Sequence, residues 1–99
     1  MTEKMRRALL LMFIYGDHLR QYQDGLVRCA TTPPKYKGET FLPEYIHWNT
    51  VYALSFHNLI YYGLRYGGGA YRVREDGLKT LQSFPEFEWA VSIKTAIEL

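Results

Sequence analysis

The side chains best suited to metal binding or nucleophilic catalysis are one cysteine and three histidines, scattered at His18, Cys29, His47 and His57. No Cys-x-x-Cys or His-x-x-x-His pair occurs, so the spacing of a zinc site is missing from the sequence. Two carboxylate pairs, Glu75 with Asp76 and Glu86 with Glu88, stand near predicted helix starts, where the helix dipole favours negative charge. We therefore expect no catalytic residues, no metal, no cofactor and no enzymatic activity.

Arginine, lysine and tyrosine side chains offer a different chemistry, the binding of a macromolecule. Arg65, Arg72 and Arg74 flank the glycine run 67–69, and Lys35 and Lys37 form a basic pair in a proline-containing loop. Arginine and lysine can neutralise the phosphates of duplex DNA, whereas tyrosine and arginine often anchor protein interfaces. Four of the nine tyrosines lie close to the same glycine run: Tyr61, Tyr62, Tyr66 and Tyr71. The net charge of +2 does not decide between a DNA partner and a protein partner.

Length and composition predict a single domain over residues 1–99. The chain has 99 residues, of which 47% are apolar, and this is enough for one hydrophobic core. The single cysteine excludes an internal disulfide and fits a reducing compartment, which predicts a cytoplasmic protein. The apolar run 8–15 is far shorter than the roughly 20 residues of a membrane span. We expect a core helix there and no membrane association.

Hydrophobic periodicity and turn residues predict four helices and one two-stranded hairpin. The expected helices lie near Thr2–Asp24, Asn49–Tyr62, Glu75–Gln82 and Pro85–Ile97, and the hairpin lies at Leu64–Val73. One short helical turn is expected at 41–46. Gly25 and Gly63 are the expected ends of the first two helices, and Ser83 with Glu86 matches the capping box of the last helix.

The same periodicity predicts which side chains form the core. We expect seven residues to be mostly buried: Leu9, Met12, Phe56, Leu59, Leu64, Leu78 and Leu81. Gly77 should let its helix approach a neighbouring element closely, because glycine has no Cβ.

Three segments in a fixed order resemble the winged-helix family: Thr50–Leu54, Asn58–Leu64 and Tyr71–Leu81. The match covers about 41–81. The resemblance implies a mostly α fold with a small β-hairpin, a winged helix-turn-helix with a long N-terminal helix and an extra C-terminal helix. The family includes small prokaryotic, archaeal and phage transcriptional regulators, so the resemblance implies binding of duplex DNA through helix 49–63 and the wing 64–73. Arg74 stands where the family usually has threonine, and helix 49–63 contains no lysine or arginine.

The candidate binding residues follow from this reading. The helix would offer Asn49, Thr50, Ala53, His57 and Tyr61, the wing would offer Arg65, Tyr66, Arg72 and Arg74, and the loop would offer Lys35 and Lys37. The alternative is a winged-helix protein-interaction module, a viral or accessory inhibitor or adaptor, that uses the tyrosine- and arginine-rich surface. We also expect a homodimer formed through the two terminal helices, since both extend beyond the compact motif and two-fold pairs are the commonest oligomers.

Overall fold

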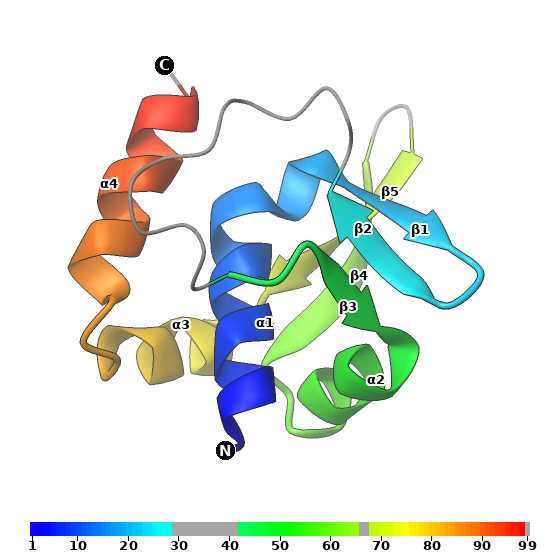
Figure 1. The fold of residues 1–99 in the computed structure, drawn as a ribbon, viewed down its shortest axis with the longest axis horizontal. Coiled ribbons are helices and arrows are strands. Elements are labelled where there is room, and N and C mark those ends of the chain that lie inside the picture. The colour runs from blue at the N-terminus through cyan, green and yellow to red at the C-terminus, as the bar shows by residue number, and fades with distance from the viewer. Residues whose placement is uncertain (29–41, 66–67, 99) are drawn as a thin grey trace.

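The computed structural model describes residues 1–28, 42–65 and 68–98, and it shows a mixed α/β protein (Figure 1). The elements follow in the order α1 (Glu3–Tyr15), η1 (Gly16–His18), β1 (Leu19–Tyr22), β2 (Gly25–Arg28), β3 (Tyr45–His47), α2 (Trp48–Phe56), β4 (Ile60–Arg65), β5 (Gly68–Val73), α3 (Glu75–Gln82) and α4 (Phe87–Glu98). The strands form two antiparallel sheets, one in the order β1-β2-β3 and one with β4 beside β5. The sequence predicts one hairpin and otherwise helices. This is wrong, because the structure contains a three-stranded sheet in addition to the hairpin.

Helix α1 lies at the centre of the molecule, with α3 and α4 on one side and the sheets on the other (Figure 1). Thr2 caps it, because its hydroxyl accepts a hydrogen bond of 3.2 Å from the backbone N–H of Met5. Seven of its 13 residues are buried: Ala8, Leu9, Leu10, Leu11, Met12, Ile14 and Tyr15. None of the helices in the described ranges is long and apolar enough to cross a bilayer.

The first helix ends at Tyr15, nine residues before the predicted end at Asp24. Leu19–Tyr22 instead pairs with Gly25–Arg28 as a hairpin that turns at 23–24. Gly25 therefore belongs to a strand and is not a helix stop. Strand β3 completes this sheet, so the helical turn predicted for 41–46 is also wrong.

The second helix is shorter than predicted, because the chain leaves it at Asn58 and not at Gly63. Asn58 has a positive φ of 59°, a left-handed conformation that asparagine adopts more readily than most residues. The N–H of Leu59 then bonds back to the carbonyl of Leu54 at 3.0 Å and closes the last turn. The hairpin accordingly begins at Ile60, and Gly63 lies inside β4, where it faces Ala70.

This early exit changes which side of α2 faces the core. Of the predicted core residues, Leu9, Met12, Leu59 and Leu81 are buried as expected. Phe56 and Leu64 are 83% and 85% exposed, and Leu78 is also exposed. Helix α2 buries Thr50, Val51 and Leu54, the side opposite to Phe56. The prediction that Phe56 is buried assumed that the helix continued to Gly63.

The C-terminal helix packs on α1 within the same chain. The predicted capping box does not form: Ser83 Oγ donates to the carbonyl of Thr80 at 2.6 Å, and Glu86 accepts a hydrogen bond of 2.5 Å from Arg6. Ile93 is buried against α1, and the rings of Phe13 and Phe87 lie 5.8 Å apart. The apolar side chains on which the homodimer was predicted thus serve the core of one chain, and the homodimer stays a prediction.

Truncating Leu59 to alanine is expected to destabilise the protein by about 2 kcal/mol. This is the lower end of the range for buried leucines, because Leu59 is slightly exposed where α2 passes into β4. Urea denaturation at constant m-value measures the change. A loss below about 1 kcal/mol would show that the Leu59 side chain is not packed as described.

Candidate functional site

The indole of Trp48 fixes the start of α2 against the β1–β2 turn. Its Nε1 donates to the carbonyl oxygens of Tyr22 and Gln23, at 3.1 and 2.8 Å. Its backbone N–H donates to the carbonyl of Asp24 at 3.1 Å. These bonds tie the first turn of α2 to the three-stranded sheet, so the exposed side of α2 is held in a fixed direction.

Four aromatic rings connect α2 to the hairpin, and we call them the aromatic row: Trp48, Tyr52, Tyr62 and Tyr71. Trp48 stacks on Tyr52, with centroids 6.1 Å apart and planes at 16°. Tyr71 packs against Trp48 at 6.1 Å and against Tyr62 at 5.1 Å. Burial raises the pKa of Tyr71, and the phenol groups of Tyr52 and Tyr62 raise it further because two nearby phenolates would repel. The four rings therefore pack on one another, with Tyr71 in contact with both Trp48 and Tyr62.

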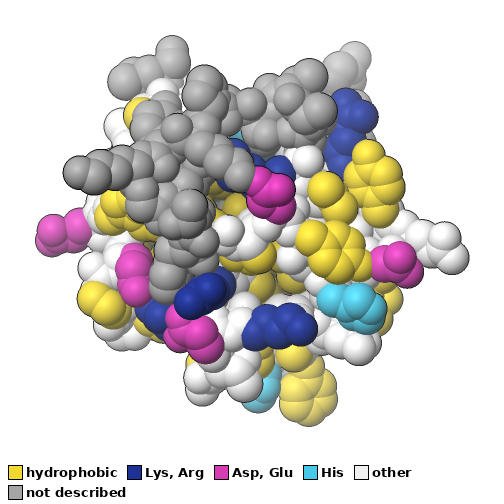
Figure 2. Space-filling view, in the orientation of Figure 1, with side chains coloured by type: hydrophobic (Ala, Val, Ile, Leu, Met, Phe, Trp, Pro, Cys, Tyr) yellow, Lys and Arg dark blue, Asp and Glu magenta, His cyan; other side chains and the backbone are white. Residues whose placement is uncertain are grey.

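The outer parts of this region are apolar and open to solvent. Tyr52 is 61% exposed, and Tyr62, Phe56 and Leu64 are exposed as well. Tyr52 and Phe56 are four residues apart, so they lie on one side of α2, a helix without any charged residue. Hydrophobic side chains are also visible over the β1–β3 sheet and at the foot of α2 (Figure 2). Exposed apolar side chains at this density are typical of a binding surface.

The structure places the predicted helix residues on different sides of α2. Asn49 and His57 are exposed and Ala53 is half-buried. Thr50 is only 7% exposed, so its predicted exposure is wrong. It lies next to Val51 on the side of the helix that packs on the core.

The tyrosines and arginines of the hairpin divide between its two faces, and Tyr61, predicted to lie on the helix, belongs to β4. Successive strand residues point to opposite faces, and the register pairs Tyr61 with Arg72 and Tyr62 with Tyr71. Tyr62 and Tyr71 thus share the face toward α2, whereas Tyr61 and Arg72 occupy the other face. The guanidinium of Arg74 lies 5.6 Å from the Tyr61 ring, on that same second face. Arg72, Arg74 and the exposed side of α2 therefore do not form one continuous surface.

Arg72 is also engaged within the chain, since its Nη2 lies 2.7 Å from Asp17 Oδ1 in an ion pair. Arg65 is the last residue of β4, with its backbone opposite Gly68. Tyr66, Lys35 and Lys37 lie outside the described residues.

The sequence-based prediction assigned Phe56 and Leu64 to the core, although they are the most exposed apolar residues of this region. One signal could have corrected this. Asn58 followed by Leu59 is itself a helix-ending pair, because asparagine accepts a left-handed conformation. A helix that ends there has one buried side through Val51 and Leu54, which leaves Tyr52 and Phe56 facing solvent.

Within residues 1–28, 42–65 and 68–98, no three His, Cys, Asp or Glu side chains gather as they would around a metal ion. Comparisons of the chain with protein-family models, curated proteins and solved structures find no match. The chemistry of the aromatic row and its surroundings is therefore the basis for assigning a function.

Proposed function

We propose that the chain is a protein-binding module, and that its partner docks on the aromatic row together with Phe56 and Leu64. One observation carries this proposal. An uncharged helix presents Tyr52 and Phe56 to solvent at 61% and 83% exposure, beside a hairpin that presents Tyr62 and Leu64. Burial of such side chains by a partner is strongly favourable, at about 25 cal/mol per Å² of apolar surface.

The shape of the region also favours a protein partner. Trp48 and Tyr71 are held by their neighbours, so the exposed rings of Tyr52 and Tyr62 are already positioned before binding. Ordered aromatic side chains lose little conformational entropy when a partner covers them, and tyrosine is enriched among interface hot spots. Helix α2 offers no cation for a phosphate backbone.

Removing one exposed ring is expected to weaken partner binding by about 30-fold, which corresponds to about 2 kcal/mol at a central anchor. The test begins with affinity capture of a partner from lysate of the source cells and continues with titration of the purified partner. Tyr52→Ala and Phe56→Ala should each show the loss, and a fourfold rise in salt should change the affinity little. Val91→Ala is the matched control, since Val91 is an exposed apolar residue on α4.

Two results would contradict the proposal. One is equal loss of partner binding in Val91→Ala and Tyr52→Ala, which would show that the partner does not select the aromatic row. The other is the absence of any protein partner combined with salt-sensitive binding to duplex DNA.

Duplex DNA is the second candidate, and the element order supports it. Helix α2, the β4–β5 hairpin and α3 follow one another as in the winged-helix proteins that the sequence resembles, and we propose a winged-helix fold on this basis. Exposed Asn49 and Arg74 are available for base-edge and phosphate contacts.

If DNA is the ligand, replacing Arg72 and Arg74 with alanine should lower the affinity for every sequence. The slope of affinity against salt should fall by about one unit for each lost phosphate contact. Asn49→Ala should instead relax the sequence preference. Thr50→Ala should not, because Thr50 is buried.

A further inference from the structure

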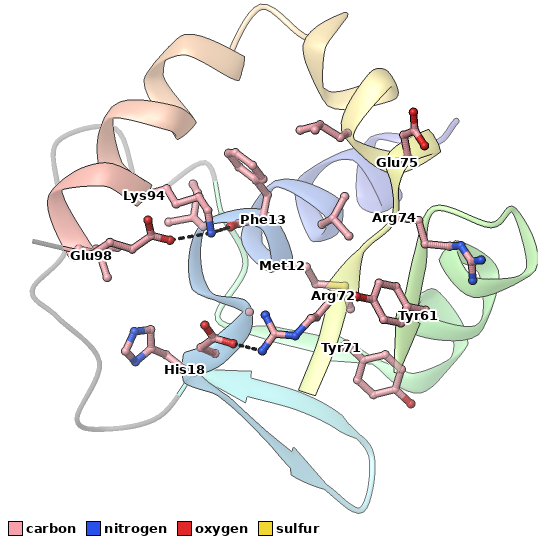
Figure 3. Close-up of a pocket in the computed structure, with 16 residues that line it drawn as sticks. Met12, Phe13, His18, Tyr61, Tyr71, Arg72, Arg74, Glu75, Lys94 and Glu98 are labelled. Atoms are coloured by element: carbon pink, nitrogen blue, oxygen red, sulfur yellow. Dashed lines mark hydrogen bonds and ion pairs between the residues drawn. The ribbon is translucent and has the colours of Figure 1, made fainter. Parts of the chain in front are cut away.

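A cavity of about 380 Å³ lies between the C-terminal end of α1, strand β5 and the helices α3 and α4 (Figure 3). Its floor is apolar and is formed by Met12, Phe13, Val73, Leu78 and Ile97. The volume falls within the range of small-molecule sites, which have mostly apolar walls and a few polar groups. Leu78 is exposed, contrary to prediction, because it faces this cavity and not the core.

Three cationic residues line the cavity, and two of them reach it from different elements, Arg72 from β5 and Lys94 from α4 (Figure 3). The Arg72 side chain is only 23% exposed, and its single hydrogen bond within the described residues goes to Asp17. A guanidinium has five N–H donors, so most of these donors are left for an incoming acceptor. Lys94 Nζ donates to the carbonyl of Phe13 at 3.2 Å and pairs with Glu98 at 3.0 Å.

The acidic partners of these cations lie nearer to solvent than the cations do. Asp17 is 49% exposed, about twice the exposure of Arg72, and Glu98 is likewise more exposed than Lys94. A carboxylate at the rim loses little free energy when it turns toward water. The less exposed cation that it leaves is then stabilised by any anion that takes the place of the carboxylate. Arg74 and Glu75 also line the cavity, but both are exposed. All three lining carboxylates are thus more exposed than Arg72 and Lys94, so a ligand that reaches the apolar floor meets cations there.

We propose that this cavity binds a small organic anion with an apolar body. The carboxylate of the ligand accepts hydrogen bonds from Arg72, and its apolar body lies on Met12, Phe13 and Leu78. Tyr71 of the aromatic row also lines the cavity, but Tyr52, Phe56 and Leu64 do not, so the proposal does not depend on the proposed function.

The test uses 4-phenylbutyrate as the probe and the full chain with labelled methyl groups for NMR titration. We expect the probe to shift the methyl signals of Met12, Leu78 and Ile97. The neutral 4-phenylbutyramide should bind at least about 10-fold more weakly, because it lacks the charge for Arg72. Butyrate, which lacks the ring, should also bind at least about 10-fold more weakly. Equal binding of the acid and the amide, or no shift at these methyl groups at millimolar probe, would overturn the proposal.

Substitutions around the cavity distinguish specific binding of the probe from its nonspecific adsorption to apolar surface. Asp17→Asn should tighten 4-phenylbutyrate binding about 3- to 10-fold, since it removes the carboxylate that competes for Arg72. Leu78→Ser should weaken it by a similar factor, and Lys79→Ala on the exposed side of α3 is the matched control. Weaker binding in Asp17→Asn, at an unchanged circular dichroism spectrum, would show that the site does not select an anion. None of these results bears on the proposed docking of a protein partner at Tyr52, so the two proposals can fail independently.

Discussion

Replacing Gly77 with alanine is expected to destabilise the protein by more than about 3 kcal/mol. Gly77 is buried in α3, and a Cβ atom there would lie 2.2 Å from the carbonyl oxygen of Leu59 and 2.8 Å from Cγ1 of Val73. The first of these is backbone, which is itself held by a 2.9 Å hydrogen bond from the N–H of Arg74. Alanine would therefore push α3 away from the junction of α2 and β4, and overpacking of this kind is costly.

The sign of the Gly77 effect makes the test decisive. Alanine in a helix interior is normally about 1 kcal/mol better than glycine, so a variant without a clash would gain stability. Lys79→Ala in the same helix is the control, and we expect a change within about 0.5 kcal/mol because Lys79 is exposed. Urea denaturation followed by circular dichroism measures both. An unchanged or raised stability of Gly77→Ala would show that α3 does not approach Leu59 this closely.

Replacing Gly25 with alanine should also destabilise the protein by more than about 3 kcal/mol, in this case by disrupting the three-stranded sheet. Gly25 begins β2 opposite His47, and an added Cβ would lie 2.0 Å from the carbonyl oxygen of Ile46. Strand β3 would have to move away from β2. Because β3 leads directly into Trp48, the bonds that hold the start of α2 would be lost as well.

Gly63→Ala is the matched control for Gly25→Ala, because Gly63 is also a strand glycine. There an added Cβ would meet the side chain of Tyr61 at 3.1 Å, and a side chain can shift more easily than backbone. We expect a loss of about 1 kcal/mol or less for this control. Thermal unfolding gives the two stabilities, and tryptophan fluorescence reports the environment of Trp48. Equal effects of the two substitutions would contradict the close approach of β3 to Gly25.

The elements that depend on short-range signals could be predicted from the sequence. The third predicted helix, Glu75–Gln82, has the observed bounds. The start of the first helix is set by the Thr2 cap, and the glycine run 67–69 marks the hairpin that the structure shows at 60–73. The burial of Leu9, Met12 and Leu81 also follows from spacing within single helices.

The three-stranded sheet could not be predicted, because its pairing joins distant segments. Strand β3 at 45–47 pairs with β2 at 25–28, and neither short strand has a strong signal of its own. A strand is stabilised by the partner beside it, and the partner is selected only when the chain folds. The same applies to the end of α1, where the pairing of β1 with β2 prevailed over a continuing helical pattern.

The orientation of the candidate site was likewise decided by tertiary structure. The sequence contains the tyrosines and arginines around the hairpin, and it shows that α2 has no charge. Which of them share a surface depends on the end of α2 at Asn58 and on the register of β4 with β5. Because strand side chains alternate between faces, the register is enough to put Arg72 and Tyr71 on opposite faces of the hairpin and to place Tyr71 against Trp48. Residue types therefore set what chemistry is available, while packing determines where each group acts.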